Sequence, residues 1–191
     1  MTRLSSSSSL FSYYLGADAL STFRCERLEE KLRALCPTIA QVRAKLVYLV
    51  AHASTLESEE QQKLARLLDA KVQPTDIAVG ADIFLIVPRA GTISPFASKA
   101  TEIAKLCGLS NVLRIERGIE YQITRKTDLL SQIRQKMDVL DDDAQRTAMA
   151  QVLFDPMTET VLYSRENIAE LFTMLAPKSL VWVDVQGRGR D

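Results

Sequence analysis

The sequence has little of several residue types on which common classes of protein site depend. Its 191 residues include one histidine, three cysteines and one tryptophan. Cys25, Cys36 and Cys107 are too far apart in the sequence for a C-x-x-C redox or zinc pair, and His52 adds almost nothing to a set of metal ligands. The sequence therefore predicts free thiols in a reducing compartment, and no metal site.

An excess of one charge is also missing. The 24 Lys and Arg residues balance the 24 Asp and Glu residues, whereas a dedicated binder of nucleic acid or of an anionic membrane carries a basic excess. No apolar run approaches the roughly 18–20 residues that a membrane span requires. The glycine spacings that cradle nucleotide phosphates do not occur either. We expect a cytoplasmic protein with no nucleic-acid partner and no membrane segment.

What the sequence does contain is typical of a globular domain, because 47% of its residues are hydrophobic and 25% are charged. The serine run Ser5–Ser9 follows Arg3 and has no apolar stretch of the kind that a secretory signal needs. We interpret residues 1–10 as a disordered Ser-rich leader. An organelle transit segment is the alternative.

The first half of the chain shows alternating strand and helix signals. Residues 11–15 predict a strand that Gly16 closes, and residues 19–35 predict a helix capped by Asp18 and ended before Pro37. Residues 45–53 predict a strand buried on both faces. Ser58 and Gln61 predict a capping box that opens a second helix, and residues 71–81 predict a loop.

The second half is more regular. Residues 83–87 predict a strand, and Ser94 followed by Pro95 predicts a helix start whose matching end is Gly108. Two strands joined around Gly118 predict a hairpin, in which the face of Ile119 is buried and the face of Glu120 and Gln122 is wet. The remaining predictions are helices at 129–137, 144–154 and 167–175 and strands at 112–116, 119–124, 159–163 and 180–185.

This order of elements indicates the fold class. Residues 83–164 give strand, helix, strand, strand, helix, strand, which is the split β-α-β arrangement of ferredoxin-like folds. Residues 11–70 are compatible with an incomplete copy of the same unit. We therefore expect an α+β two-layer sandwich, with halves at residues 11–80 and 81–164.

One loop could bind an anion. Residues 88–95 lead from a strand into a helix N-terminus, where free N–H groups and the helix dipole converge. The residues that could supply further donors, or contact another domain, are Arg89, Thr92, Ser94, Ser98 and Lys99, with Arg114 and Arg117 near Gly118. In the alternative interpretation Ser94 only caps the helix, Arg89 pairs with a carboxylate, and Arg114, Glu116 and Arg117 form a salt-bridged edge.

Other combinations of reactive residues are weaker. Cys107 could be a nucleophile with His52 as its base, but its place on an apolar helix face favours core packing. The run Asp141–Asp143 lacks metal-ligand spacing and fits the negative charge that a helix N-terminus favours. We predict no catalytic residue, no cofactor-binding residue and no metal ligand in this chain.

A specific resemblance lies in residues 88–104, which read PRAGTISPFASKATEIA. This block resembles the P-R-x-G-T-I-S-P-W-S-S-K-A-T-x-I-A stretch of the large single-chain phosphoribosylformylglycinamidine synthase, also called FGAR amidotransferase. Residues 107–109 (CGL), 114–118 (RIERG) and 155–159 (DPMTE) are similar to that family's C-G-L, R-x-E-R-G and D-R-M-T-E. Phe96 stands where the family has tryptophan and stays aromatic, whereas Pro156 replaces an arginine and removes a charge.

The resemblance implies a fold and a role. The family's N-terminal domain resembles a fused dimer of the small PurS subunit, made of two ferredoxin-like units, and residues 165–191 would begin its linker domain. The whole enzyme converts formylglycinamide ribonucleotide, glutamine and ATP to the amidine, with ATP and magnesium in synthetase domains and a separate glutaminase domain. This chain would then be a noncatalytic scaffold that docks on those two partner domains, assists ammonia transfer and self-associates when isolated. The alternative is a stand-alone ferredoxin-like module that binds a small anionic ligand.

Overall fold

The computed structural model describes residues 10–72, 81–126 and 139–173. The strands are β1 (Leu10–Asp18), β2 (Ile39–His52), β3 (Lys71–Val72), β4 (Asp82–Pro88), β5 (Val112–Arg125) and β6 (Glu159–Leu162). The helices are α1 (Thr22–Leu35), α2 (Ser58–Leu68), α3 (Pro95–Leu106), α5 (Val139–Leu153) and α6 (Ile168–Phe172), with a 3-10 turn, η1, at Arg165–Asn167. Residues 1–9 of the predicted leader, the predicted helix at 129–137 and the predicted strand at 180–185 lie outside the described residues. Leu10, which the predicted leader included, instead begins β1.

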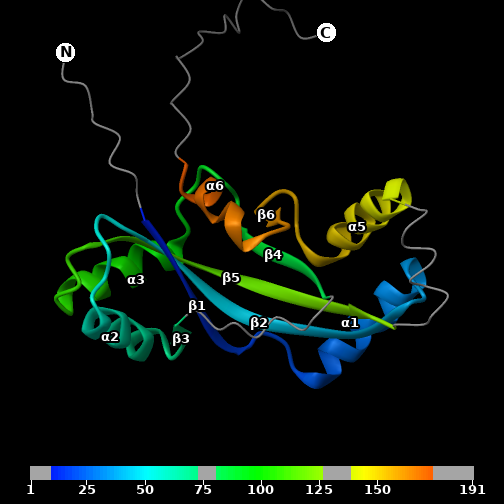
Figure 1. The fold of residues 1–191 in the computed structure, drawn as a ribbon, viewed down its shortest axis with the longest axis horizontal. Helices are drawn as coiled ribbons and strands as arrows, with labels where there is room; N and C mark the ends of the chain where they lie inside the picture. The colour runs from blue at the N-terminus through cyan, green and yellow to red at the C-terminus, as the bar shows by residue number, and fades with distance from the viewer. Residues whose placement is uncertain (1–9, 73–80, 127–138, 174–191) are drawn as a thin grey trace, which may run out of the picture.

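All six described strands form one antiparallel sheet in the order β3-β1-β2-β5-β4-β6. The two longest strands, β2 and β5, have 14 residues each and pair along nearly their whole length, from Ile39 opposite Arg125 to His52 opposite Val112. Figure 1 shows them crossing the middle of the molecule, with α2 and α3 at one end and α1 and α5 at the other. The predicted α+β, two-layer, ferredoxin-like fold is confirmed.

The two halves of the chain repeat one unit. Each half runs strand, helix, strand, helix, strand in its described residues, and the strand order reads the same from both edges of the sheet. An offset of 73 positions relates the starts of α1 and α3, at Thr22 and Pro95, and the starts of β2 and β5, at Ile39 and Val112. Because Leu46 and Ile119 are related by this offset and also pair with each other, a pseudo-two-fold axis passes between them.

One connection departs from this symmetry. Residues 19–21 join β1 to α1, whereas residues 89–94 join the equivalent β4 to α3. The second connection is thus three residues longer than the first. It is also the centre of the sequence block on which the family resemblance depends.

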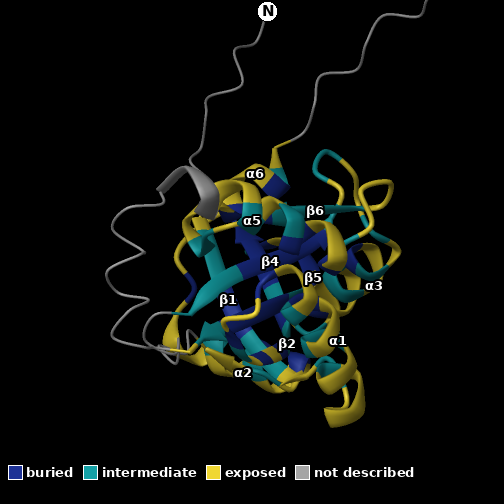
Figure 2. Ribbon diagram, turned by 90° about the vertical axis from the view of Figure 1, so that its right-hand side faces the viewer, coloured by how far each residue is buried: buried dark blue, intermediate teal, exposed yellow. Residues whose placement is uncertain are grey.

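Two cores lie on the sheet face that α1, α2, α3 and α5 cover, and each is built from both halves of the chain. Side chains of a strand alternate between faces, so Val42, Ala44 and Val50 of β2 point to one face and Val47 and Leu49 to the other. At one end α1 and α5 share a core through Leu32 and Met149 with Val42 and Ala44, and at the other end α2 and α3 share one with Val50. On the opposite face α6 covers Val47 and Leu49. Figure 2 shows the buried strands inside and the exposed helix faces outside.

The predicted hairpin around Gly118 is wrong, because residues 112–125 form one continuous strand. Gly118 lies mid-strand opposite Val47, where a Cβ atom would come within 2.5 Å of the carbonyl oxygen of Ile86. The glycine is therefore needed for close approach of the β4 backbone, not for a turn. The predicted wet face is wrong as well, since Glu120 and Gln122 are buried beneath segments distant in the sequence.

Smaller differences concern the ends of elements. The N-cap of α1 is Ser21, not Asp18, because β1 continues past Gly16 to Asp18. The capping box of α2 is formed by Glu57 and Glu60, one position before the predicted Ser58 and Gln61. The predicted loop after residue 70 begins with β3, and α5 begins before the run Asp141–Asp143 and includes it.

Candidate functional site

The longer connection between β4 and α3 is shaped by local signals in its own sequence. Pro88 is the last residue of β4, and Ser94 caps α3 by accepting a hydrogen bond at Oγ from the backbone N–H of Ala97, at 3.0 Å. Pro95 takes the first helical position, which needs no N–H. Between these ends, the Thr92 hydroxyl donates to the carbonyl oxygen of Arg89 at 2.6 Å and tightens the turn. The predicted cap at Ser94 is confirmed, as is Gly108 (φ 85°) just beyond α3.

A carboxylate of the chain itself occupies the anion position at the start of α3. The backbone N–H of Ser94 donates to Oε1 of Glu116 at 3.2 Å, and the Ser94 hydroxyl donates to Oε2 at 2.5 Å. The Nε of Arg114 donates to Oε1 at 2.9 Å, and the Glu116 side chain is fully buried. The dipole and the N–H group that could attract a free anion are thus already matched by a charged partner.

The sequence blocks that carry the family resemblance meet at this point. The N–H of Arg89 donates to the carbonyl oxygen of Thr158 at 2.9 Å, and the N–H of Ala90 donates to Oγ1 of Thr160 at 3.2 Å. From β5, Nη2 of Arg114 donates to the carbonyl oxygen of Thr92. Residues 89–94, Arg114 and residues 155–160 are therefore joined by hydrogen bonds, and we call the exposed part of this region the loop surface.

The turn at residues 155–159 is held by its own aspartate. Oδ1 of Asp155 accepts from the N–H of Met157 at 2.9 Å, and Oδ2 accepts from the hydroxyl of Thr158 at 3.2 Å. The N–H of Asp155 in turn donates to Oε2 of Glu159 at 2.9 Å. This network leaves the Met157 side chain pointing outward, 78% exposed. Met157 is thus an exposed apolar side chain on a turn that hydrogen bonds hold in place.

The structure brings together some of the predicted site residues and separates others. Arg89, Thr92, Ser94 and Arg114 meet in the loop surface, and the Arg89 guanidinium reaches the carbonyl oxygen of Met157 at 3.5 Å. Ser98 and Lys99 are exposed on α3. Arg117 points to the face of the sheet opposite that of Glu116, and its guanidinium lies 4.6 Å from the centre of the Phe96 ring.

His52 and Cys107 do not form a nucleophile and base. Both ring nitrogens of His52 are in hydrogen bonds: Nδ1 lies 2.7 Å from the carbonyl oxygen of Ser54, and Nε2 lies 2.8 Å from the hydroxyl of Ser12. Because a carbonyl oxygen only accepts, Nδ1 donates the hydrogen bond to Ser54. Cys107 is the half-buried C-cap residue of α3.

A second polar cluster, which the sequence did not reveal, lies around buried Glu120. Arg165 of η1 donates to both carboxylate oxygens at 2.7 Å, the Tyr13 hydroxyl donates at 2.7 Å and the Gln122 amide at 2.8 Å. The Arg165 guanidinium also lies 4.4 Å from the centre of the Tyr13 ring. The cluster therefore ties η1, next to α6, to strands β1 and β5.

The protonation of this cluster follows from its burial and partners. Burial alone would raise the pKa of the Glu120 carboxyl, but hydrogen bonds from Arg165, Gln122 and Tyr13 outweigh it and hold that pKa below its usual range. Burial and the charge of Glu120 raise the pKa of Tyr13, so the Tyr13 hydroxyl remains a donor. The signal in the sequence was weak, because Glu120 and Gln122 fit the alternation of a half-exposed strand.

Within the described residues, no three His, Cys, Asp or Glu side chains gather in a way that could hold a metal ion. No helix in that part of the chain is long and apolar enough to cross a membrane.

Comparison with known protein families shows which family the chain belongs to. The family model for the N-terminal region of formylglycinamide ribonucleotide amidotransferase matches residues 45–172, which is more than half of the chain. The chain belongs to this family. The FGAR amidotransferase match runs from the middle of β2 to the end of α6, and it contains all the sequence blocks that form the loop surface.

Proposed function

We propose that this chain is a noncatalytic N-terminal part of FGAR amidotransferase that docks on the enzyme's synthetase and glutaminase domains. The observation that carries the proposal is the loop surface. It is built from separate sequence blocks, its polar groups bond to one another, and it presents Met157 outward. Such a surface suits contact with another protein domain better than capture of a small ligand, because Glu116 already occupies the start of α3.

The proposed role within the enzyme is that of a scaffold in the cytoplasm. The complete enzyme would use ATP, Mg²⁺, glutamine and formylglycinamide ribonucleotide in its other domains. Docking of this chain would hold the synthetase and glutaminase domains in contact and help ammonia pass between them without loss to water. We also expect the isolated chain to self-associate through the exposed loop surface.

The experiment is reconstitution in trans. The synthetase and glutaminase domains of a family member are produced without the N-terminal region, and the 191-residue chain is added. We expect glutamine-dependent formation of the amidine to require this chain, and expect the chain alone to show neither glutaminase nor ATPase activity. Turnover by the chain alone would contradict the proposal.

Two variants direct this test to the loop surface. Met157→Asp and Arg89→Glu place negative charge on it, and we expect each to weaken binding of the chain to the other domains at least tenfold. Phe23→Asp is the matched control, since Phe23 is an apolar side chain, 65% exposed, at the start of the symmetry-related α1. Equal loss of binding in the control, or no loss in either loop variant, would refute docking through this surface.

A further inference from the structure

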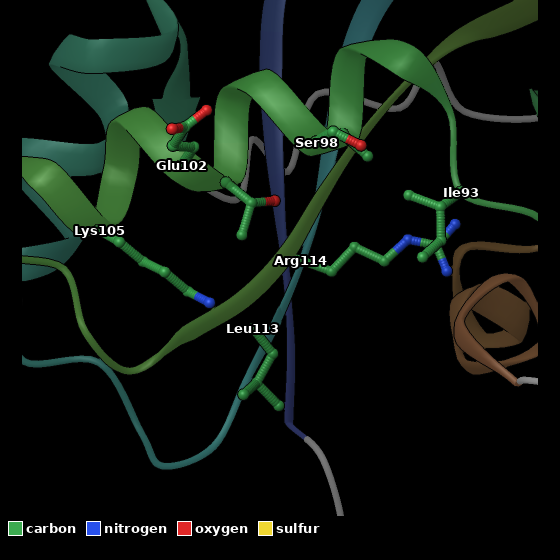
Figure 3. A pocket seen from close by; sticks show the side chains of 8 residues that line it. Ile93, Ser98, Glu102, Lys105, Leu113 and Arg114 are labelled. Atoms are coloured by element: carbon green, nitrogen blue, oxygen red, sulfur yellow. The ribbon is translucent and has the colours of Figure 1, made fainter.

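Arg114 joins two parts of the molecule that are distant in the sequence. On one side, its guanidinium donates hydrogen bonds to Glu116 and to the carbonyl oxygen of Thr92, inside the longer connection between β4 and α3. On the other side, the same guanidinium lies 5.4 Å from the centre of the Phe172 ring at the end of α6. In Figure 3 the Arg114 side chain extends from β5 toward Ile93 of the connection, and α6 lies beside both. Because one guanidinium makes both sets of contacts, a change in α6 reaches the connection.

The helix α6 is too short to be stable by itself. It has five residues, whereas isolated helices shorter than about 12–15 residues are marginal in water. Its buried side chains, Ile168 and Leu171, pack against β1, β2, β4 and β6. The Phe172 ring adds a stack on Phe11, with ring centres 5.3 Å apart. The helical form of α6 therefore depends on its packing against the sheet.

The turn η1 anchors α6 to the sheet through an ion pair. Arg165 lies in η1, directly before α6, and donates to both carboxylate oxygens of Glu120 at 2.7 Å. The Glu120 side chain is fully buried, so loss of Arg165 removes the cation that compensates its charge. A short segment held by an ion pair at one end and by aromatic contacts at the other is expected to open as one unit. We call η1 and α6 together the clasp.

We propose that the clasp controls the loop surface: residues 89–94 keep their conformation only while the clasp is packed on the sheet, and Arg114 couples the two. When the clasp opens, Arg114 loses the Phe172 ring and becomes exposed to water, which weakens its bonds to Glu116 and Thr92. The connection then loses the contacts that order it from the side of β5.

This coupling has a consequence for docking. Coupling between two sites is reciprocal, so a partner bound to the loop surface would also stabilise the clasp. The coupling itself is a property of the chain alone. Its consequence, that the chain docks only with its clasp closed, rests on the proposed function.

Two variants separate the joint from the anchor. Phe172→Leu keeps an apolar side chain on α6 but removes the ring beside Arg114, and it leaves the contacts of β6 with the connection in place. Arg165→Gln removes the anchor. Arg33→Gln is the matched control, because it breaks an ion pair with Glu29, also at 2.7 Å, on α1 in the other half of the chain.

Hydrogen exchange of single amides, followed by NMR on the 191-residue chain, measures the coupling without any partner. The amide of Ser94 donates to Glu116 and reports on the longer connection. The amide of Ala19 donates to the carbonyl oxygen of Ala44 and reports on the shorter one. We expect Phe172→Leu and Arg165→Gln each to speed exchange at Ser94 at least tenfold and at Ala19 less than twofold. The control variant should leave Ser94 unchanged.

Two results would overturn the coupling, whatever the outcome of the docking experiment. One is unchanged exchange at Ser94 in Phe172→Leu. The other is equal acceleration at Ser94 and Ala19, which would show a general loss of stability. If circular dichroism shows that Arg165→Gln has unfolded, Phe172→Leu decides alone.

Binding to the enzyme's other domains tests the consequence separately. Phe172 is not part of the loop surface, yet we expect Phe172→Leu to weaken that binding at least threefold. Exchange that changes as expected in a chain that does not bind those domains would refute the proposed function and leave the coupling established. Full binding by a variant with accelerated exchange at Ser94 would refute the consequence for docking.

Discussion

Ser94 and Glu116 are joined by two hydrogen bonds, one from the backbone N–H and one from the hydroxyl of the serine. The pair links the start of α3 to the middle of the sheet and holds the longer connection in one conformation. Arg114 completes it from two positions away on β5. A cap, a carboxylate and a guanidinium thus form one structural unit.

Glu116→Gln should destabilise the chain by about 3–5 kcal/mol, because removing one partner of a buried ion pair leaves the other charge uncompensated. The Arg114 side chain is only 12% exposed. Urea unfolding measures the loss. In the double variant Arg114→Gln with Glu116→Gln, no charge is left alone, so the combined loss should be smaller than the sum of the single losses. Additive losses would show that the two side chains are not coupled.

Two adjacent tyrosines should respond in opposite directions to loss of the hydroxyl. The Tyr14 side chain is fully buried and its hydroxyl has no hydrogen-bond partner, and burial raises its pKa to about 12. Tyr14→Phe should therefore stabilise the chain by about 1–3 kcal/mol. Tyr13→Phe removes a hydrogen bond to a charged carboxylate and should destabilise it by about 1.5–3 kcal/mol.

The symmetry of the fold supports the first of these expectations. Tyr14 pairs with Tyr48, and in the other half Phe84 pairs with the equivalent Tyr121. The fold thus already places a fully buried phenylalanine at the related position. Thermal unfolding of both variants, beside the unaltered chain, measures the two effects. A lower melting temperature for Tyr14→Phe would show that its hydroxyl has a partner, such as buried water.

Glu120 should make stability depend on pH in the acid range. Its folded pKa is lowered, so its contribution is present above the unfolded value of about 4.3 and is lost as pH falls through the folded value. The free energy of unfolding should therefore fall below about pH 5, and Glu120→Gln should flatten this decrease. Glu26→Gln, on the exposed part of α1, is the control and should not change the slope. An unchanged slope in Glu120→Gln would contradict the expectation.

The sequence predicted most reliably the features that neighbouring residues determine. Ser94, Pro95 and Gly108 marked the ends of α3 correctly, because a cap, a fixed φ and a left-handed residue each act within one turn. At Gly118 the same local logic failed. A glycine between two apolar stretches fits a turn, and only the position of Ile86 on a neighbouring strand shows that the residue serves close backbone approach.

The candidate site followed the same division. Arg89, Thr92, Ser94 and Arg114 were found because they lie in or beside a distinctive motif. The partner of Ser94 could not be found, since alternation along β5 does not show which carboxylate faces a helix start. Glu120 was placed on a wet face because nothing near it in the sequence indicates that Arg165 covers it.

The halves should not fold separately. Leu32 and Met149 share one core although they belong to different halves, and Val50 and Ala104 share another. We expect chains of residues 1–80 and 81–191 each to lack a cooperative unfolding transition at low micromolar concentration, and expect their mixture to regain one. Circular dichroism with urea measures this. A cooperative transition in either half, shown to be monomeric by light scattering, would contradict the expectation.

The longer connection between β4 and α3 has a consequence for stoichiometry. A true two-fold dimer presents every surface twice, so it can bind two copies of a partner or one copy in either of two orientations. In this chain the first half has the short connection of residues 19–21 at the position related by symmetry to residues 89–94. The loop surface is therefore not repeated in the first half. A partner that recognises this connection therefore binds once per chain and in a single orientation.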